Sequence, residues 1–356
     1  MNNISLLMIT PILGQGGTEI YILNLAEFLK EKDINPIVMS DGGVRENEIS
    51  NKNLKYIKVK CLHKRSPINI FKAIYHIAHV VIRENIQLIH ASSIYTTIVS
   101  KIVTVILLKP YIKVLITLHG GPNRNIEKTS AKLLNIFADK VVALSEVAKE
   151  KLIKFGLRSE KIKVIYNGIK PLKKTTKETT DKIVVGTCGR LTEQKGHKFL
   201  IEAISKIEVP GVQCLIAGDG ELRNELQKQV NELGVSERVK LLGFRNDIAG
   251  LLNSMDVFVL PSLWEQLPIS ILEAMSLGKP IIATSVNGVP EELGDCGILI
   301  NPANVEEIIN AVELLVKNKE LREELGRKAE QRFYKYFRQE VMGEKTLEVY
   351  KEFLDL

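Results

Sequence analysis

Two glutamates lie eight residues apart where an apolar run gives way to a helical pattern. Glu265 follows the run Val257–Leu260, and Glu273 falls in a helix expected from Pro268, as its first residue, to the stop at Gly278-Lys279-Pro280. At about 1.5 Å of rise per helical residue, we expect the carboxylates to be too distant for a glycosidase pair on one bond. They could instead hold two ends of an elongated ligand, with the helix N-terminus facing an anion between them. The alternative is a solvated loop acid at 265 and a helix-dipole acid at 273.

Two cations occupy the loop 189–196, directly after the apolar run 182–188. Arg190 offers a forked donor and Lys195 a point-like one, a pair that suits a diphosphate whose leaving-group charge must be neutralised. The alternative, two solvated loop cations, is the commoner state of an isolated Arg/Lys pair.

A glycine-rich loop, residues 10–19, follows the first apolar run of the chain. Gly16 and Gly17 would let the backbone approach a ligand closely, and the next helix would present free N–H groups to an anion. Because the loop lacks the G-x-G-x-x-G dinucleotide fingerprint, a plain tight turn remains an alternative to a phosphate site.

One histidine stands where a functional side chain is expected. His119 ends the apolar strand Val114–Leu118 and precedes Gly120-Gly121-Pro122. The carboxyl ends of parallel strands are where ligands of such sheets bind, so His119 is a candidate functional residue. His90 has a similar place after Ile86–Ile89, so position alone does not establish a function, and a functional role is less favoured for His90 than for His119.

The elements that position these residues alternate between short apolar runs and amphipathic helical patterns. Near-continuous apolar runs are typical of strands covered on both faces, and the alternation predicts parallel sheets with right-handed crossovers. We expect an α/β fold of two doubly wound, Rossmann-like domains that face each other across a cleft. The expected strands are 4–9, 34–39, 54–59, 86–91, 113–119, 140–145, 162–168, 182–188, 212–217, 239–243, 257–261, 280–285 and 297–300.

The domain boundary is marked by composition. A chain of 356 residues is too long for one hydrophobic core. Residues 171–181 are polar and without periodicity, which predicts a linker between a first domain, 1–170, and a second, 182–337. We expect the last helix, 338–356, to pack back on the first domain.

Charge is divided unequally along the chain. Residues 1–170 carry 25 Lys and Arg against 13 Asp and Glu (+12), and residues 171–356 carry 24 against 29 (−5), which sum to the net +7. Only the first half is therefore expected to face something anionic, and an anionic membrane surface is a candidate partner. The apolar segment Ile94–Leu108 is too short to span a bilayer and could lie on one, or simply cover the sheet. Nucleic acid is not expected, because no binding motif is present.

The four cysteines lie far apart and show no metal-site spacing. The first residues contain no basic region of the kind that begins a signal peptide. We expect a cytoplasmic protein, or one bound peripherally to the inner face of the plasma membrane.

Together these segments resemble the family 4, or group 1, GT-B glycosyltransferases, of the bacterial or archaeal surface-polysaccharide type. The order and spacing of the motifs from residue 16 to residue 291 make the resemblance specific. The matching segments are Gly16-Gly17-Thr18-Glu19, Thr117-Leu118-His119-Gly120, Gly189-Arg190-Leu191, Lys195-Gly196, Ala217-Gly218-Asp219-Gly220-Glu221-Leu222, Glu265 with Glu273-Ala274-Met275, Gly278-Lys279-Pro280 and Gly288-Val289-Pro290-Glu291.

The resemblance implies an enzyme of hexosyltransferase type that moves a sugar, with retention, from a nucleotide diphosphate sugar to a hydroxyl of a glycan or lipid-linked acceptor. A UDP-sugar is the favoured donor, and no metal or other cofactor is implied. Arg190 and Lys195 would bind the diphosphate and Glu273 the ribose. His119 and Glu265 would be the catalytic residues beside the transferred sugar.

Further donor contacts are implied at matching positions. The amides of Leu267, Ile269 and Ser270 would contact sugar or phosphate, and Phe244 would lie beside the base. Gly16 and Gly17 would close over the phosphates. Family members commonly have Gly-Phe-Gly after the first glutamate, whereas this chain has Gln266-Leu267-Pro268, so the donor sugar cannot be assigned by analogy.

Other functions remain open on the sequence. A nucleotide-sugar 2-epimerase would use the same donor without an acceptor, and a non-catalytic subunit of an assembly complex would only bind it. A dinucleotide oxidoreductase is disfavoured because neither half shows its glycine fingerprint.

Overall fold

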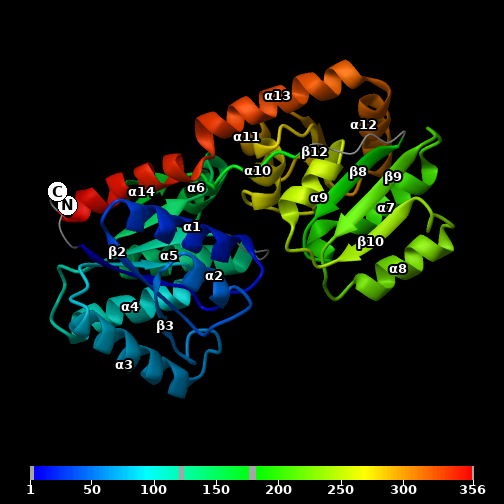
Figure 1. Ribbon diagram of the computed structural model, residues 1–356. Coiled ribbons are helices and arrows are strands. Elements are labelled where there is room, and N and C mark those ends of the chain that lie inside the picture. The colour runs from blue at the N-terminus through cyan, green and yellow to red at the C-terminus, as the bar shows by residue number, and fades with distance from the viewer. Residues whose placement is uncertain (1–3, 120–123, 176–181, 355–356) are drawn as a thin grey trace. The chain divides into compact units, whose positions relative to one another are not determined.

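The computed structural model describes residues 4–119, 124–175 and 182–354, which form two compact units (Figure 1). Unit 1 comprises residues 1–168 with 339–356, and unit 2 comprises residues 169–338. Residues 176–181 of the predicted linker and the segment Gly120-Gly121-Pro122 lie outside the described residues.

Unit 1 contains a seven-stranded parallel sheet in the order β3-β2-β1-β4-β5-β6-β7. All its strands run the same way because each is joined to the next by a helix or loop crossover. The strands are β1 Ser5–Ile9, β2 Asn35–Ser40, β3 Lys55–Lys58, β4 Leu88–Ala91, β5 Lys113–Leu118, β6 Lys140–Ala143 and β7 Ile162–Val164.

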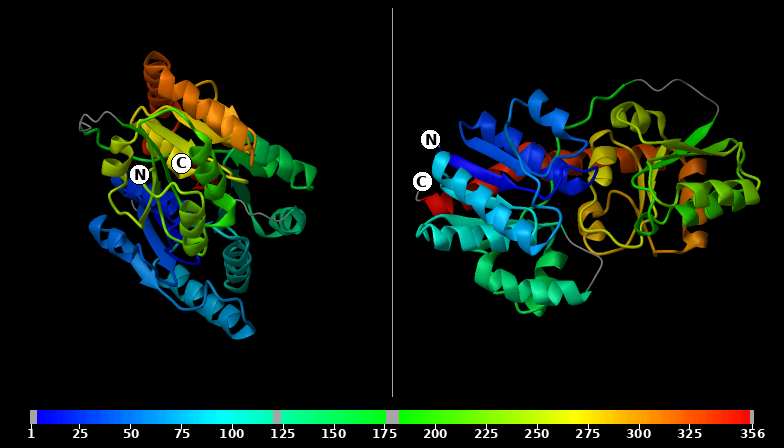
Figure 2. Two further views of the ribbon diagram at one scale, coloured as in Figure 1. Left: turned by 90° about the vertical axis from the view of Figure 1, so that its right-hand side faces the viewer. Right: turned by 90° about the horizontal axis from the view of Figure 1, so that it is seen from below.

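Helices cover both faces of this sheet (Figure 2). Side chains alternate between the faces, so Leu6 and Met8 of β1 join one core cluster while Leu7 and Ile9 join another. Both faces are apolar, which is why the strands read as continuous apolar runs. The helices are α1 Gly17–Glu31, α2 Glu46–Asn51, α3 Pro67–Arg83, α4 Ile94–Ile106, α5 Arg124–Phe137, α6 Glu146–Lys154 and α14 Gln339–Leu354, with a 3₁₀ turn η1 at Ser159–Lys161.

The apolar segment Ile94–Leu108 forms α4 and the turn after it. The buried residues of α4 include Val99 and Val103, which belong to the core cluster beneath α3 and α4. Helix α4 therefore covers the sheet, the alternative stated above, while Val105, Ile106 and Leu108 at the end of the segment are exposed. None of the helices within the described residues has the length and apolar character needed to cross a bilayer.

The last helix, α14, belongs to unit 1 and packs against α1. At the contact, Gly343 faces the ring of Phe28, and a Cβ atom added to Gly343 would lie 2.2 Å from that ring. Phe28 is only 2% exposed, so its ring has no room to move aside. A residue without a side chain is required where these two helices meet.

Substituting Gly343→Val tests this helix contact. Overpacking of a tight core contact costs about 1–3 kcal/mol, so we expect the free energy of unfolding to fall by that amount. Urea denaturation measures it, with Glu348→Val, at an exposed position of the same helix, as the control. A loss no larger than that of the control would show that α14 does not depend on this close approach.

Unit 2 contains a six-stranded parallel sheet in the order β10-β9-β8-β11-β12-β13. The strands are β8 Ile183–Cys188, β9 Val212–Ala217, β10 Val239–Gly243, β11 Val257–Leu260, β12 Ile281–Thr284 and β13 Ile298–Ile300. The helices are α7 His197–Lys206, α8 Arg223–Glu232, α9 Ile248–Ser254, α10 Ile269–Ser276, α11 Val289–Leu293, α12 Val305–Lys317 and α13 Lys319–Tyr336, with a 3₁₀ turn η2 at Glu193–Lys195. The predicted α/β class with two doubly wound parallel sheets is confirmed.

Each sheet has one point where the strand order reverses. In unit 1, β1 pairs with β2 on one side and with β4 on the other. In unit 2, β8 pairs with β9 and with β11. The loops that leave the carboxyl ends of the two central strands diverge at such a point, which creates the crevice where ligands of doubly wound sheets bind.

Candidate active site

The predicted donor residues of unit 2 lie on the two loops that flank its reversal point. Arg190 and Lys195 belong to the loop after β8, and Glu265 belongs to the loop after β11. The helix that follows, α10, carries Glu273. Residues some seventy positions apart in the chain therefore come together because β8 and β11 are neighbours in the sheet.

Lys195 and Glu265 form an ion pair across these two loops. The Lys195 Nζ lies 2.5 Å from the Glu265 Oε1, and the two side chains are 13% and 8% exposed. Neither is a solvated loop charge, which was the alternative for each. The Lys195 ammonium has three donors, and the pair with Glu265 uses one of them.

Sequence reasoning missed the residues that support Glu265. Ser262 donates a hydrogen bond of 2.9 Å to Oε1, and the Gln194 amide lies 3.4 Å from Oε2. The Asn287 side chain donates to the Glu265 backbone carbonyl at 2.6 Å. Gln194 and Ser262 are close in sequence to the two charged residues, and that proximity was the available signal. Nothing in the sequence pattern singles out Asn287.

A second carboxyl group near Glu265 was also missed. Glu292, on α11, is fully buried, and neither of its carboxyl oxygens has a hydrogen-bond partner among the described residues. Burial, and then the negative charge of Glu265, raise the pKa of Glu292 well above its usual 4.5. The Glu292 carboxyl group therefore stays protonated over part of the pH range in which a glutamate of the unfolded chain is ionised.

This burial predicts how stability depends on pH. With a raised pKa in the folded state, Glu292 keeps a proton that the unfolded chain releases, so the folded state loses stability as pH rises above about 4.5. Replacing Glu292→Gln removes this loss, and we expect the variant to be more stable than wild type at pH 8 but not at pH 4.

Urea denaturation from pH 4 to pH 8 measures the effect. Glu323→Gln, at an exposed position of α13 in the same unit, is the control and should follow the wild-type profile. Parallel profiles for wild type and Glu292→Gln would contradict a protonated Glu292.

Arg190, Phe244 and Glu273 complete the predicted set in unit 2. Arg190 is exposed, and its guanidinium has no ion pair among the described residues. Phe244 follows β10 and is 48% exposed. Burial is the larger cause of the raised pKa of the Cys188 thiol, and the negative charge of Glu273 is the second. Because Cys188 is the last residue of β8, Glu273 lies near the end of that strand. Arg190 is thus the cation in this loop that is available to an anionic ligand without breaking an existing pair.

The start of α10 differs in one respect from the prediction. The helix begins at Ile269, not at Pro268, because Pro268 has an extended backbone (φ −70°, ψ 120°) and precedes the first turn. Leu267 and Ile269 are 4% and 7% exposed, and the Ser270 Oγ is buried without a hydrogen-bond partner among the described residues. The polar group that this helix start can offer is therefore the Ser270 hydroxyl, together with free N–H groups of the first turn.

In unit 1, the glycine-rich loop leads directly into α1. Gly16 is the N-cap residue and Gly17 the first residue of the helix. The Glu19 carboxylate folds back over this loop, and a Cβ atom added to Gly16 would lie 2.7 Å from its Oε2. A side chain at position 16 would displace Glu19, which gives the glycine a packing reason in addition to any ligand contact.

His119 directly follows β5, as predicted, and packs edge-on against the ring of Tyr21, with 4.9 Å between ring centroids. Its Nε2 is buried and has no hydrogen-bond partner among the described residues. Burial lowers the pKa of His119 to about 3, so the imidazole is neutral at physiological pH. A neutral imidazole can accept or donate a hydrogen bond but carries no charge to a ligand.

His90 is a structural residue, in agreement with the sequence interpretation. Its two ring nitrogens lie 2.6 Å from the Tyr350 hydroxyl and 2.8 Å from the Thr117 hydroxyl, and it is fully buried. Thr117 in turn lies 3.0 Å from the Tyr21 hydroxyl. This chain of buried hydrogen bonds runs from α14 to the tyrosine that packs against His119.

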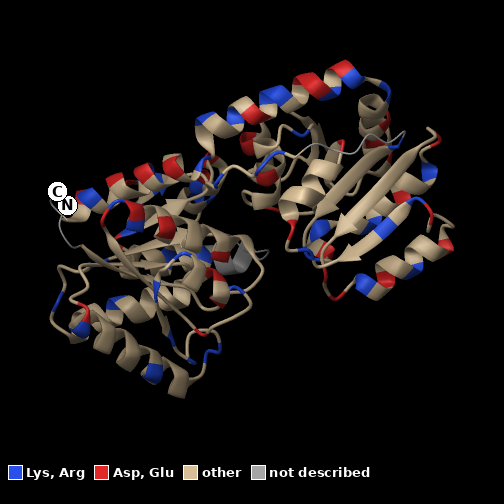
Figure 3. Cartoon of the chain, in the orientation of Figure 1, with Lys and Arg blue, Asp and Glu red and all other residues tan. Residues whose placement is uncertain are grey.

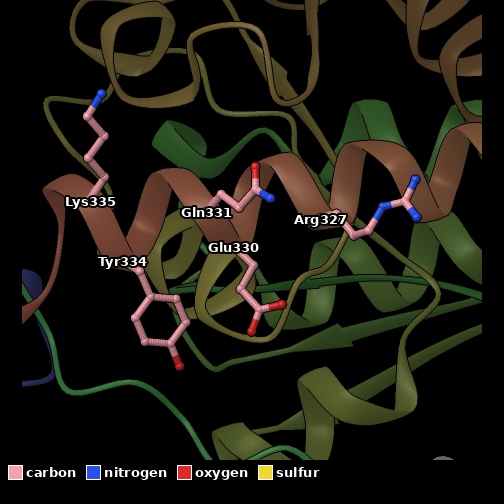
Figure 4. A pocket seen from close by; sticks show the side chains of 5 residues that line it. All are labelled: Arg327, Glu330, Gln331, Tyr334 and Lys335. Carbon is pink, nitrogen blue, oxygen red and sulfur yellow. The ribbon is translucent and has the colours of Figure 1, made fainter.

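One surface hollow is lined by none of the predicted residues. It has a volume of about 560 Å³ and is lined by side chains of α13 (Figure 4). Its residues are Arg327, Glu330, Gln331, Tyr334 and Lys335. No group of three or more His, Cys, Asp or Glu that could hold a metal ion occurs within the described part of the chain.

Comparison with known proteins identifies the class and then the family. Solved structures with this two-unit architecture are GT-B glycosyltransferases, among them HepE from Anabaena in complex with UDP-glucose, with a TM-score of 0.85 at 23% identity over 98% of this chain and 99% of that one. Residues 169–332 match the family described as Glycosyl transferases group 1, and residues 15–171 match Glycosyltransferase Family 4. The chain belongs to these group 1, family 4 glycosyltransferases.

Two relatives illustrate the sequence similarity. An Escherichia coli protein named UDP-Gal:alpha-D-GlcNAc-diphosphoundecaprenol alpha-1,3-galactosyltransferase is 31% identical over 319 residues, 81% of each chain. An uncharacterized glycosyltransferase from Methanocaldococcus jannaschii is 32% identical over 231 residues, which is 59% of each chain.

Proposed function

We propose that this glycosyltransferase moves a sugar from a UDP-sugar to a hydroxyl of a glycan or lipid-linked acceptor, with retention of configuration and without a metal ion. The observation that carries the proposal is the grouping of Arg190, Lys195 and Glu265 on the loops that flank the reversal point of unit 2, with Glu273 on the helix α10 that follows one of them. The E. coli relative is named for a UDP-galactose donor and a diphosphoundecaprenol-linked acceptor, and HepE was solved with UDP-glucose.

The roles follow from the chemistry of each group. Arg190 and the two remaining donors of Lys195 bind the diphosphate, and Glu273 binds the ribose hydroxyls. Glu265 contacts the transferred sugar while Lys195 and Ser262 fix its orientation. Phe244 lies beside the base. On unit 1, Gly16 and Gly17 approach the phosphates, and the neutral imidazole of His119 contacts the sugar.

The transfer step moves charge onto the leaving phosphate. The bond between the anomeric carbon and the phosphate oxygen breaks as the acceptor hydroxyl attacks that carbon from the same face. The acceptor's proton passes to the departing UDP. Arg190, Lys195 and the N-terminus of α10, with the amides of Leu267, Ile269 and Ser270, stabilise the developing negative charge without a metal ion. The nucleotide sugar is a co-substrate, and no cofactor takes part in the transfer.

The Arg190→Ala variant tests the donor site. Losing one preorganised donor of this kind costs on the order of a hundredfold in rate, so we expect release of UDP from UDP-glucose or UDP-galactose to fall by about that factor. The assay is run in excess EDTA, with water as the acceptor. Stabilisation against heat by free UDP, about 2.7 kcal/mol for wild type at 100 times the Kd, should shrink in the variant.

Arg327→Ala, an exposed arginine on α13, serves as the matched control and should behave as wild type. Turnover of Arg190→Ala within a few-fold of wild type would remove Arg190 from the site. Loss of wild-type turnover in EDTA, restored by a divalent cation, would contradict metal independence. Conversion of the UDP-sugar to its epimer would favour the 2-epimerase alternative.

A further inference from the structure

Helix α3 presents large apolar side chains on its outer face as well as on its inner one. Its inner face is buried in the core through Ala73, Ile77, Val80 and Val81. On the outer face Ile68, Phe71, Tyr75 and Ile82 are 67, 73, 66 and 59% exposed. Their spacing of i, i+3, i+7 and i+14 places them along one stripe of the helix. Contiguous exposed apolar side chains of this size mark an interaction surface.

The charged residues within α3 are basic, and one acid, Glu84, follows its last residue and lies 3.6 Å from the Arg83 Nε. Lys72 and Arg83 are exposed beside the apolar residues, and we call Ile68, Phe71, Lys72, Tyr75, Ile82 and Arg83 the α3 face. Figure 3 shows the charged residues of this helix as basic only. From residue 51 to residue 83 the chain contains six lysines and two arginines and no aspartate or glutamate. Lys52, Lys55 and Lys58 are paired with Glu27, Glu84 and Glu46, whereas no ion pair is made among the described residues by Lys60, Lys64, Arg65 and Lys72.

The N-terminus of α3 lies at the edge of the unit 1 sheet where the strands have their carboxyl ends. The helix follows β3 and returns antiparallel to the strands, so its first residues lie near the carboxyl ends of the strands, the edge to which Gly16 and His119 belong. The preceding segment adds three exposed basic residues there, Lys60, Lys64 and Arg65. A surface that lies along α3 therefore reaches the edge of unit 1 that carries its site residues.

We propose that the α3 face docks on an anionic phospholipid bilayer, with Ile68, Phe71, Tyr75 and Ile82 inserted at the level of the headgroups. An interfacial helix of this kind combines buried apolar area with attraction between basic residues and anionic lipid. A second copy of the chain is a poorer occupant, because pairing two α3 faces would bring Lys72 and Arg83 against like charges. The inference rests on the proposed function only in that a lipid-linked acceptor would be reached from this surface.

The test is co-sedimentation of the full-length protein with vesicles, measured without donor or acceptor. We expect wild type to bind vesicles of phosphatidylcholine with phosphatidylglycerol, and to bind pure phosphatidylcholine or vesicles in high salt far more weakly. Phe71→Ser with Tyr75→Ser should lower the partition coefficient by at least roughly tenfold, because two inserted side chains are lost. Lys72→Gln with Arg83→Gln should lower it by roughly fivefold per charge.

Matched controls carry the same changes elsewhere. Ile136→Ser with Leu314→Ser removes two exposed apolar residues, and Lys228→Gln with Lys319→Gln removes two exposed charges. Both controls should bind anionic vesicles as wild type does. Because the substituted residues of α3 are exposed, thermal midpoints and stabilisation by UDP should be unchanged in the α3 variants.

Three results would overturn the proposal: wild type that stays in the supernatant, α3 variants that bind as tightly as wild type, or an α3-dependent dimer in solution that binds no vesicles. Failure of the proposed function is distinguishable, since it would appear as an absence of UDP binding and turnover in wild type while vesicle binding persisted.

Discussion

One buried ion pair holds together the two loops on which the proposed donor site depends. Lys195 and Glu265 lie 2.5 Å apart across the reversal point of the unit 2 sheet. Removing both charges from water is costly, and the pair is tolerable because the Glu265 carboxylate also has Ser262 and Gln194 as partners. The pair fixes the position of the Lys195 ammonium in the absence of a ligand. Arg190, the exposed cation of the same loop, has no ion pair among the described residues and is the proposed phosphate ligand.

The buried polar side chains near His119 in unit 1 are neutral, whereas those near Glu265 in unit 2 form an ion pair. Tyr350, His90, Thr117 and Tyr21 form a continuous buried hydrogen-bonded chain, and Tyr21 packs against the ring of His119. Burial lowers the pKa values of both histidines to about 3, so the chain remains uncharged near neutral pH. Satisfied networks of this kind rigidify their surroundings. The last helix of the protein thereby contributes to the position of a residue that follows the fifth strand.

The sequence allowed much of the fold to be predicted and drew attention to the charged residues of the proposed site, but it did not show how their side chains pair. Apolar runs revealed the strands because both faces of each sheet are covered. The strand order, which places Glu265 beside the β8 loop, is seen only in the structure. The contact between Lys195 and Glu265 joins residues seventy positions apart, and no local pattern encodes it. Nothing in the sequence distinguishes Glu292 from the other acidic residues, and only the structure shows that it is buried. Hydrophobicity likewise drew attention to Ile94–Leu108, whose helix α4 packs on the sheet and whose last residues are exposed. It did not single out the exposed apolar stripe of α3.

The claim that the Lys195–Glu265 pair organises this site is tested most directly by a double-mutant cycle in urea denaturation. Lys195→Met and Glu265→Gln should each lower the free energy of unfolding, by up to about 3–5 kcal/mol where the remaining charge stays buried and unpaired. The double variant leaves no unpaired charge. We therefore predict that its loss is smaller than the sum of the single losses by at least about 1 kcal/mol. Additive losses would show that the two side chains do not stabilise each other, and would contradict the account.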